Sequence, residues 1–232
     1  MLRVFIGADS NEIVALHVLM HSIMRHSSVP VSITPLILPQ LPMTRERDRH
    51  QSTEFAFSRF LVPWLCGYEG QALFMDCDML CRADIAELFN GADLSKAVSV
   101  VPHHYTPAAG NKFLNQHQTQ YARKNWSSCM LFNNFLCQQL TPEYVNEATG
   151  LELHQFKWLA DSEIGKLAPE WNHLVGEIAP NPAAKIVHFT LGTPCFAKYS
   201  RCEFAQEWRD ERALMLDYNR MGEFSKPERV AA

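Results

Sequence analysis

The N-terminal part of the chain alternates between strand and helix patterns, and this order constrains the fold more than any other sequence feature. Val4–Ile6 is a short apolar run closed by a turn-like segment. Apolar residues then recur at helical spacing over Asn11–His26, with Ser10 or Asn11 as the expected N-cap. A second apolar run covers Val31–Leu38, and its proline places this strand near a sheet edge. Strand, helix and strand in this order predict a parallel βαβ unit.

The same alternation continues, and we expect one α/β domain over residues 1–232 with a mostly parallel sheet flanked by helices. Helices are predicted over Glu54–Leu65, over Leu153–Leu167 and, as a closing helix, over about residues 200–222. Further strands are predicted at four apolar runs, Gln71–Met75, Ala97–Val101, Cys129–Phe132 and Lys185–Phe189. The polar stretch Met43–Thr53 is predicted to be a mobile loop.

Composition excludes several classes of protein. The formal net charge is −4 and the charges are spread along the chain, which argues against a nucleic-acid partner or a polybasic lipid anchor. The seven cysteines contain no C-x-x-C pair, so they are expected to be reduced thiols. We find no signal-peptide pattern and no apolar run long enough to span a membrane, and therefore expect a cytoplasmic protein. The oligomeric state is left open.

The most informative motif, Asp76-Cys77-Asp78, follows an apolar strand pattern. Acids spaced two apart leave the same face of an extended chain, so both can reach one hard cation. A cation would also neutralise two carboxylates that are costly to bury unpaired. This geometry suits a divalent metal that carries a diphosphate. The side chain of Cys77 should point to the opposite face and is given no nucleophilic role. The alternative is that Asp78 or Asp84 only caps a helix around Ile85–Phe89.

Two segments around this motif resemble the glycogenin-like glycosyltransferases, family eight of the sequence-based classification. They are T-E-F-A-F-S-R-F from Thr53 to Phe60 and A-L-F-M-D-C-D-M-L from Ala72 to Leu80. The resemblance runs from about Val4 to Phe196. It implies the GT-A fold and the binding of a nucleotide diphosphate sugar, expected to be a UDP-sugar, through a divalent metal. That metal is usually Mn²⁺, with Mg²⁺ as the other possibility.

The resemblance also implies three metal ligands, Asp76, Asp78 and His188. His188 opens the segment H-F-T-L-G-T-P-C-F, which is similar to the family motif H-F-x-G-x-x-K-P-W. Two carboxylates and one imidazole form a mixed oxygen and nitrogen set that suits Mn²⁺ better than a thiolate-preferring ion. The alternative for His188 is a core histidine bonded to a backbone carbonyl.

Catalytic roles follow from the resemblance for Arg59, which would lie near the donor, and for Asp161, which would lie near the reacting sugar. The first strand and its loop would hold the donor base and ribose, and Gly7 would permit close backbone approach. The expected donor contacts are Ile6, Gly7, Ala8, Asp9, Arg59, Asp76, Cys77, Asp78, Ser127, Ser128 and Gly192.

The C-terminal motif departs from the family pattern. Pro194 stands where a lysine is usual, and Cys195 stands where a tryptophan is usual. The family lysine would neutralise the leaving diphosphate. Arg59, Lys198 and Lys185 are the cations that can substitute for it.

We therefore expect a metal-dependent glycosyltransferase that moves a hexose from a nucleotide diphosphate sugar to a hydroxyl of a saccharide or another acceptor. Family members retain the anomeric configuration, so retention is expected. One alternative is a nucleotide-sugar-binding protein without transfer activity, which the missing lysine suggests. A second is a phosphatase of the haloacid-dehalogenase kind, whose apolar strand also ends in D-x-D, although Leu80 stands where that family has Thr or Val.

Overall fold

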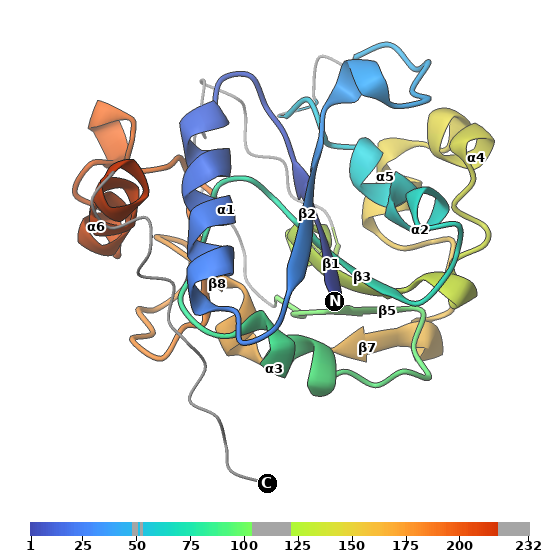
Figure 1. The fold of residues 1–232 in the computed structure, drawn as a ribbon. Helices are drawn as coiled ribbons and strands as arrows, with labels where there is room; N and C mark the ends of the chain where they lie inside the picture. The colour runs from blue at the N-terminus through green and yellow to red at the C-terminus, as the bar shows by residue number, and fades with distance from the viewer. Residues whose placement is uncertain (48–50, 52, 104–121, 218–232) are drawn as a thin grey trace, which may run out of the picture.

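A six-stranded mixed sheet forms the centre of the computed structural model, which describes residues 1–47, 51, 53–103 and 122–217 (Figure 1). The strand order is β2-β1-β3-β6-β5-β7. β1 pairs in parallel with β2 and β3, and β5 with β7, whereas β6 runs antiparallel to β3 and β5. The predicted α/β class with a mostly parallel sheet is confirmed. The strands are β1 (Leu2–Gly7), β2 (Val31–Leu36), β3 (Gln71–Met75), β5 (Val98–Val100), β6 (Cys129–Asn133) and β7 (Ile164–Lys166).

A second, three-stranded sheet has the order β4-β9-β8. β4 pairs antiparallel with β9, and β8 pairs in parallel with β9. Its strands are β4 (Met79–Cys81), β8 (His173–Leu174) and β9 (Ile186–His188). β4 follows β3 after the D-x-D motif, so this motif joins the two sheets.

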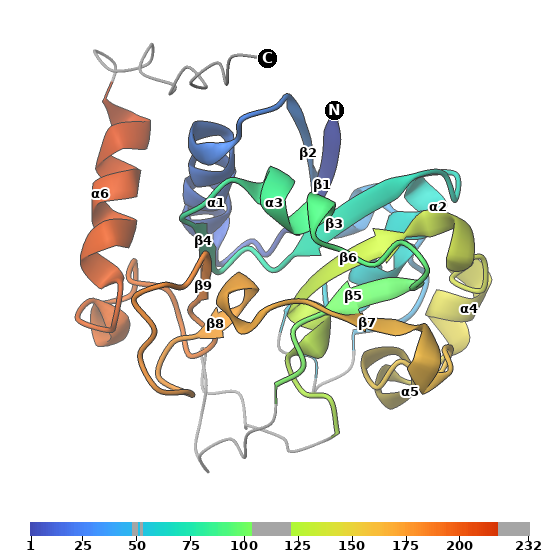
Figure 2. The same cartoon turned by 90° about the horizontal axis from the view of Figure 1, so that it is seen from below.

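The helices are short except for α1 and α6, as Figures 1 and 2 show. The α-helices are α1 (Ile13–His26), α2 (Val62–Leu65), α3 (Ile85–Asn90), α4 (Pro142–Glu147), α5 (Gly150–His154) and α6 (Ala205–Leu216). The 3-10 helices are η1 (Leu38–Gln40), η2 (Ser58–Leu61), η4 (Trp126–Ser128), η5 (Asn134–Leu136), η6 (Asp161–Glu163), η7 (Pro169–Trp171) and η8 (Ala197–Tyr199). Among the described residues, no helix has the length and apolarity needed to cross a membrane.

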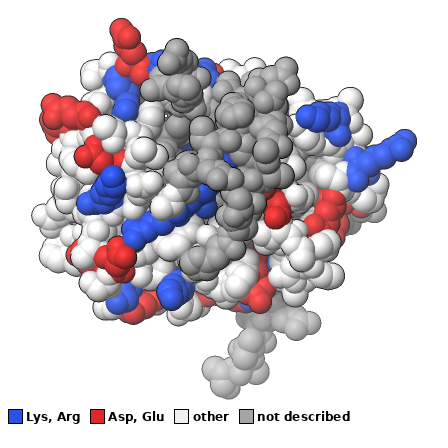
Figure 3. Space-filling model, turned by 180° about the vertical axis from the view of Figure 1, so that it is seen from behind, with Lys and Arg blue, Asp and Glu red and all other residues white. Residues whose placement is uncertain are grey.

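The core lies around β1 and β3, whose apolar runs are covered on both faces. Val4, Ile6, Leu73 and Phe74 are each fully buried. A strand buried on both faces needs an unbroken apolar sequence rather than an alternating one, which explains these runs. On the surface, Figure 3 shows acidic and basic side chains interspersed over the face opposite to that of Figure 1.

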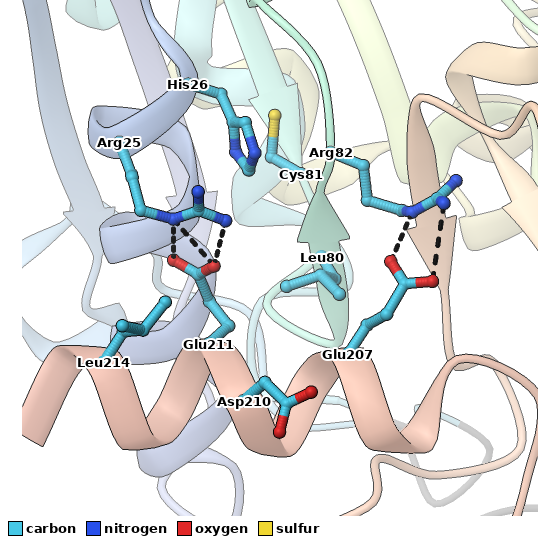
Figure 4. A pocket seen from close by; sticks show the side chains of 9 residues that line it. All are labelled: Arg25, His26, Leu80, Cys81, Arg82, Glu207, Asp210, Glu211 and Leu214. Atoms are coloured by element: carbon cyan, nitrogen blue, oxygen red, sulfur yellow. Dashed lines mark hydrogen bonds and ion pairs between the residues drawn. The ribbon is translucent and has the colours of Figure 1, made fainter. Parts of the chain in front are cut away.

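Helix α6 packs beside α1 and covers β4 (Figures 2 and 4). Trp208 is its buried anchor, at 1% exposure. Around a pocket beneath the helix, Glu211 accepts hydrogen bonds from Arg25 and Glu207 accepts them from Arg82 (Figure 4). The helix is therefore held by an apolar cluster around Trp208 and by ion pairs of Glu211 and Glu207.

Several predicted elements differ from the structure. The helix predicted over Leu153–Leu167 is wrong beyond His154, because Phe156 has a positive φ of 55° and residues 161–166 form η6 and β7. The helix predicted over Glu54–Leu65 is limited to Ser58–Leu65, where η2 runs directly into α2 and Pro63 occupies the first turn of α2, a position that needs no backbone N–H donor.

Three boundaries also need correction. The N-cap of α1 is Glu12, because the backbone N–H of Asn11 donates to Asp9 in a turn before the helix. β2 ends at Leu36 instead of Leu38. The closing helix is Ala205–Leu216, and residues 218–222 of the prediction, like 48–50 and 52 of the predicted mobile loop, lie outside the described residues.

Candidate metal and donor site

The structure brings together Asp76, Asp78 and His188, and the two sheets explain how. Asp76 and Asp78 follow the last residue of β3. In the β4–β9 pair Met79 lies opposite His188, and the backbone N–H of Phe189 donates to the carbonyl of Asp78 at 2.9 Å. This register places the imidazole beside the two carboxylates.

One ligand atom from each of these residues lies within 4.8 Å of the others. Nε2 of His188 is 3.2 Å from Oδ1 of Asp78 and 4.0 Å from Oδ2 of Asp76. The side chain of His188 is 3% exposed, while those of Asp76 and Asp78 are 13% and 16% exposed. The cluster therefore lies at a partly open edge, where a ligand can reach the carboxylates.

A hydrogen-bond network fixes which nitrogen of His188 faces the cluster. Nδ2 of Asn172 donates to Oγ of Ser128 at 2.9 Å, which turns the amide oxygen of Asn172 toward His188. That oxygen is 3.1 Å from Nδ1 of His188, so Nδ1 is the donor. Asn172 is fully buried. An outer partner of this kind orients a histidine toward a metal.

The acceptor atoms of these three side chains fit a cation. With Nδ1 bonded to Asn172, His188 points Nε2 at the oxygens of Asp76 and Asp78. Oδ1 of Asp78 is shielded from solvent and accepts no hydrogen bond from the described residues. Acceptors that face one another need a proton or a cation between them. Two carboxylates and an imidazole match Mn²⁺ or Mg²⁺, so the residues fit the group.

Arg59 is the cation that the structure places in this site. Its Nη1 lies 2.9 Å from Oδ1 of Asp76 and donates to the carbonyl of Ser127 at 2.8 Å. The guanidinium lies 5.2 Å from the ring centroid of Phe55 and 5.0 Å from that of Phe74, and Arg59 is 5% exposed. Oδ1 of Asp76 thus faces Arg59, while Oδ2 faces His188.

The loop after β1 lies at the same sheet edge, because Ile6 pairs with Met75 in the parallel β1–β3 ladder. Asp9 is 2% exposed, and its carboxylate accepts the backbone N–H groups of Asn11 and Glu54. A Cβ at Gly7 would overlap the ring of Phe55, so that ring fills the space beside this glycine. Ile6 and Ala8 are buried. Donor binding by these residues stays a prediction.

Glu12 lies behind the motif and is 3% exposed. Its Oε2 is 3.9 Å from Sγ of Cys77, while Oε1 is buried without a hydrogen-bond partner. Burial, with the charges of Asp78, Asp9 and Asp76, raises the pKa of Glu12 to about 9. Burial and the charge of Glu12 also raise the pKa of the Cys77 thiol, which agrees with a nonreactive cysteine.

The two serines predicted to contact the donor are 3% and 2% exposed and bond within the protein. Oγ of Ser127 is 2.8 Å from Nδ1 of His154. Oγ of Ser128 donates to the carbonyl of Asn125, and the carbonyl of Ser128 accepts the N–H of Asp76 at 2.9 Å. The segment Trp126–Ser128, which we call the serine turn, therefore bonds to Asp76 and Asn172, and its donor contacts stay a prediction.

Asp161 and Gly192 were the remaining predicted site residues. Asp161 is on η6 with its side chain 86% exposed, and it pairs with Arg123. Gly192 has a φ of 137°, and a Cβ there would overlap the ring of Tyr199. Of the two acids considered as helix caps, Asp84 caps α3, because its carboxylate accepts the N–H of Ala86 at 2.9 Å.

The two lysines proposed to replace the family lysine have other partners. Nζ of Lys185 donates to Oε2 of Glu87, and Lys198 lies over the ring of Tyr199 at 5.1 Å. Arg59 is thus the member of that set seen to contact the carboxylates.

Sequence reasoning gave no role to Asn172, Glu12 or His154. Asn172 closes the segment P-E-W-N, and this segment is the feature of the sequence that could have pointed to it. Nothing local marks the other two, since their contacts are with residues far along the chain.

Comparisons with solved structures identify the fold. The chain matches the bifunctional glycosyltransferase WbbM with a TM-score of 0.64 and 16% identity, covering 91% of this chain and 49% of that one. It matches the glycosyltransferase GlyE of Streptococcus pneumoniae TIGR4 with a TM-score of 0.59 and 16% identity, covering 91% and 60%. The match to the galactosyltransferase LgtC, solved with donor and acceptor sugar analogues, has a TM-score of 0.56 and 11% identity and covers 93% and 97%.

The chain thus spans about half of WbbM and 60% of GlyE. These neighbours confirm the predicted GT-A glycosyltransferase fold, and they give no support to the phosphatase alternative.

No protein-family model matches the chain. Among curated proteins, protein CDI of Arabidopsis thaliana is 45% identical over 232 residues, which covers 94% of this chain and 87% of the relative. The chain therefore belongs to the same family as protein CDI of Arabidopsis thaliana.

Proposed function

We propose that the protein is a metal-dependent glycosyltransferase of the glycogenin-like kind. It would transfer a hexose from a nucleotide diphosphate sugar, with UDP as the expected nucleotide, to a hydroxyl of a saccharide or another acceptor, with retention. The observation that carries this proposal is the convergence of Asp76, Asp78 and His188 at the sheet edge of a GT-A fold. The mixed oxygen and nitrogen set supports Mn²⁺, with Mg²⁺ as the second choice.

Asp76, Asp78 and His188 would hold the cation, which when bound neutralises the negative charge that develops on the diphosphate as the glycosidic bond breaks. Arg59 would support the same charge, since its guanidinium touches Asp76 at the site. Asp9, Gly7 and their neighbours at the end of β1 would line the nucleoside pocket. Asp161 would lie near the reacting sugar.

One observation favours the second candidate, a nucleotide-sugar-binding protein without transfer activity. Lys185 bonds to Glu87, and Arg59 is already paired with Asp76. Neither Lys185 nor Lys198 is seen against the carboxylates in the place of the family lysine. Such a protein would bind the donor and neither transfer nor hydrolyse it.

A panel of nucleotide sugars, tested by thermal shift with and without Mn²⁺, shows whether the protein binds a donor at all, since a ligand that binds the folded state raises its apparent stability. The donor that gives a Mn²⁺-dependent rise is then used to assay sugar transfer. Asp76→Asn and Asp78→Asn should lose the rise and the transfer. Asp210→Asn, an exposed change on α6, is the matched control and should keep both. Binding without turnover would support the second candidate.

A further inference from the structure

Asp76 is held by a chain of contacts that runs away from the site into α5. Nη1 of Arg59 contacts both Oδ1 of Asp76 and the carbonyl of Ser127. Nε of Arg59 has no hydrogen-bond partner among the described residues, so the two Nη1 contacts and the flanking phenylalanine rings orient the guanidinium. The position of the Ser127 carbonyl therefore influences which oxygen of Asp76 faces His188.

The backbone before Ser127 adopts a conformation that its residue types do not favour on their own. Arg123 and Asn125 have positive φ values of 61° and 62°, a conformation that is uncommon for residues other than glycine. Such a segment persists when its surroundings hold it in place. Side-chain bonds of the serine turn supply this hold.

His154 provides one of these bonds, with Nδ1 at 2.8 Å from Oγ of Ser127. Its ring packs against Phe57 and Phe60, with centroids 6.0 and 5.3 Å apart. Burial, followed by the charges of Arg59 and Arg45, lowers the pKa of His154 to about 3. The imidazole is thus neutral at ordinary pH and acts as a fixed hydrogen-bonding group instead of a proton carrier.

We propose that His154 is a positioning residue for the cation site, acting through Ser127 and Arg59 on Asp76. This inference rests on the proposed function in one respect, that Asp76 is a cation ligand. The role of His154 is to keep Oδ2 of Asp76 directed toward the position shared with Asp78 and His188.

The test measures Mn²⁺ affinity of the full chain directly, by titration with electron paramagnetic resonance of the free ion, with no need for turnover. His154→Phe keeps a planar ring and removes the bond to Ser127, and Ser127→Ala removes the other partner. Each should weaken Mn²⁺ binding on the order of tenfold, the lower end of the effect of outer-shell partners. The double variant should bind no more weakly than either single variant, because all three break the same link.

His154→Asn offers a nitrogen and an oxygen near the position of Nδ1 and should recover most of the affinity, which a role in packing alone would not predict. His17→Ala is the matched control, since His17 is an exposed histidine on α1 whose ring bonds to the carbonyl of Ile13. It should bind Mn²⁺ as the unaltered protein does. If His154→Phe does not fold, Ser127→Ala carries the same test.

The two proposals fail differently. An unaltered protein that binds no Mn²⁺ overturns the cation site and the proposed function. An unaltered protein that binds Mn²⁺, with His154→Phe or Ser127→Ala equally tight, overturns the positioning role and leaves the proposed function in place. Additive losses in the double variant also overturn it.

Discussion

Nε2 of His188 lies 3.2 Å from Oδ1 of Asp78, with Nδ1 of the same ring bonded to Asn172. The ring is therefore held with Nε2 toward a carboxylate, a contact that needs either a proton on Nε2 or a cation between the two groups. The antiparallel register of β4 and β9 places Met79 opposite His188 and so brings the imidazole beside Asp78.

Removal of divalent cations should lower the stability of the protein. At a Mn²⁺ concentration of 100 times its dissociation constant, binding stabilises the folded state by about 2.7 kcal/mol, or about 5–10 °C in Tm for a chain of this size. We expect EDTA to abolish this gain, as measured by differential scanning calorimetry. Asp78→Asn should show no response to Mn²⁺, whereas Asp210→Asn should respond fully. An equal response in both variants would place the cation elsewhere.

Asn172→Leu should damage both the fold and the cation site. The change keeps a similar volume but leaves Nδ1 of His188 and Oγ of Ser128 without their buried partner, at a cost of about 1–3 kcal/mol. The lost orientation of His188 should weaken Mn²⁺ binding about 10- to 100-fold. Urea denaturation and Mn²⁺ titration check the two effects. Asn133→Leu, which breaks a single exposed bond to the carbonyl of Leu94, is the comparison and should leave Mn²⁺ affinity unchanged.

Local patterns were sufficient for the elements that position the motif. The apolar run before Asp76 predicts β3, and the alternation over residues 4–38 predicts β1, α1 and β2. The juxtaposition of His188 with the two aspartates depends on the pairing of β4 with β9, which no local pattern specifies. It was expected from the family resemblance alone.

The remaining misses have a common physical cause. The helix predicted through Phe156 stops because that residue takes a positive φ, which tertiary packing imposes on a non-glycine residue. Likewise, Asn172 and His154 acquire their roles from partners on other elements. Side chains of this kind look ordinary in the sequence, since their contacts exist only after the two sheets and the serine turn have come together.

The contribution of His154 to stability should rise with pH between about pH 3 and pH 6.5, whereas Glu12, with its raised pKa of about 9, contributes in the opposite direction above pH 4.5. Burial and then the nearby arginines lower the pKa of His154 from 6.5 to about 3, so the unfolded chain binds more protons than the folded one within this window. The contribution is fully present above pH 6.5 and is lost as the pH falls.

In His154→Asn the contribution of residue 154 to the pH dependence of stability disappears. The slope of the unfolding free energy against pH should decrease by up to about 1.4 kcal/mol per pH unit, the value for one proton. Urea denaturation at several pH values measures it. The exposed-histidine variant His17→Asn should keep the original slope, and a slope that is identical in all three proteins would contradict the assignment.

Gly192→Ala should destabilise the loop that follows His188 and β9. Gly192 has a φ of 137°, which an L side chain rarely adopts, and a Cβ there would overlap the Tyr199 ring. We expect a loss of about 2–3 kcal/mol by thermal denaturation. Gly67→Ala is the control, because Gly67 also has a positive φ but would meet no atom within 4 Å. It should cost about 1 kcal/mol. A similar loss in both variants would show that backbone conformation alone matters.

The two ion pairs that hold α6 should differ strongly in their contribution to stability. Glu211 has a side chain that is 3% exposed and accepts from Arg25 at 3.0 Å, whereas Glu207 is 49% exposed beside Arg82. Glu211→Ala leaves Arg25 and His21 without their buried counterion and should cost about 3 kcal/mol. Glu207→Ala should cost less than about 1 kcal/mol, because water screens an exposed pair. Urea denaturation of both variants at about 0.05 M and about 1 M NaCl checks this contrast, because salt screens exposed charges. Only the Glu207 effect should fall with salt, and equal costs would contradict the stronger role of the buried pair.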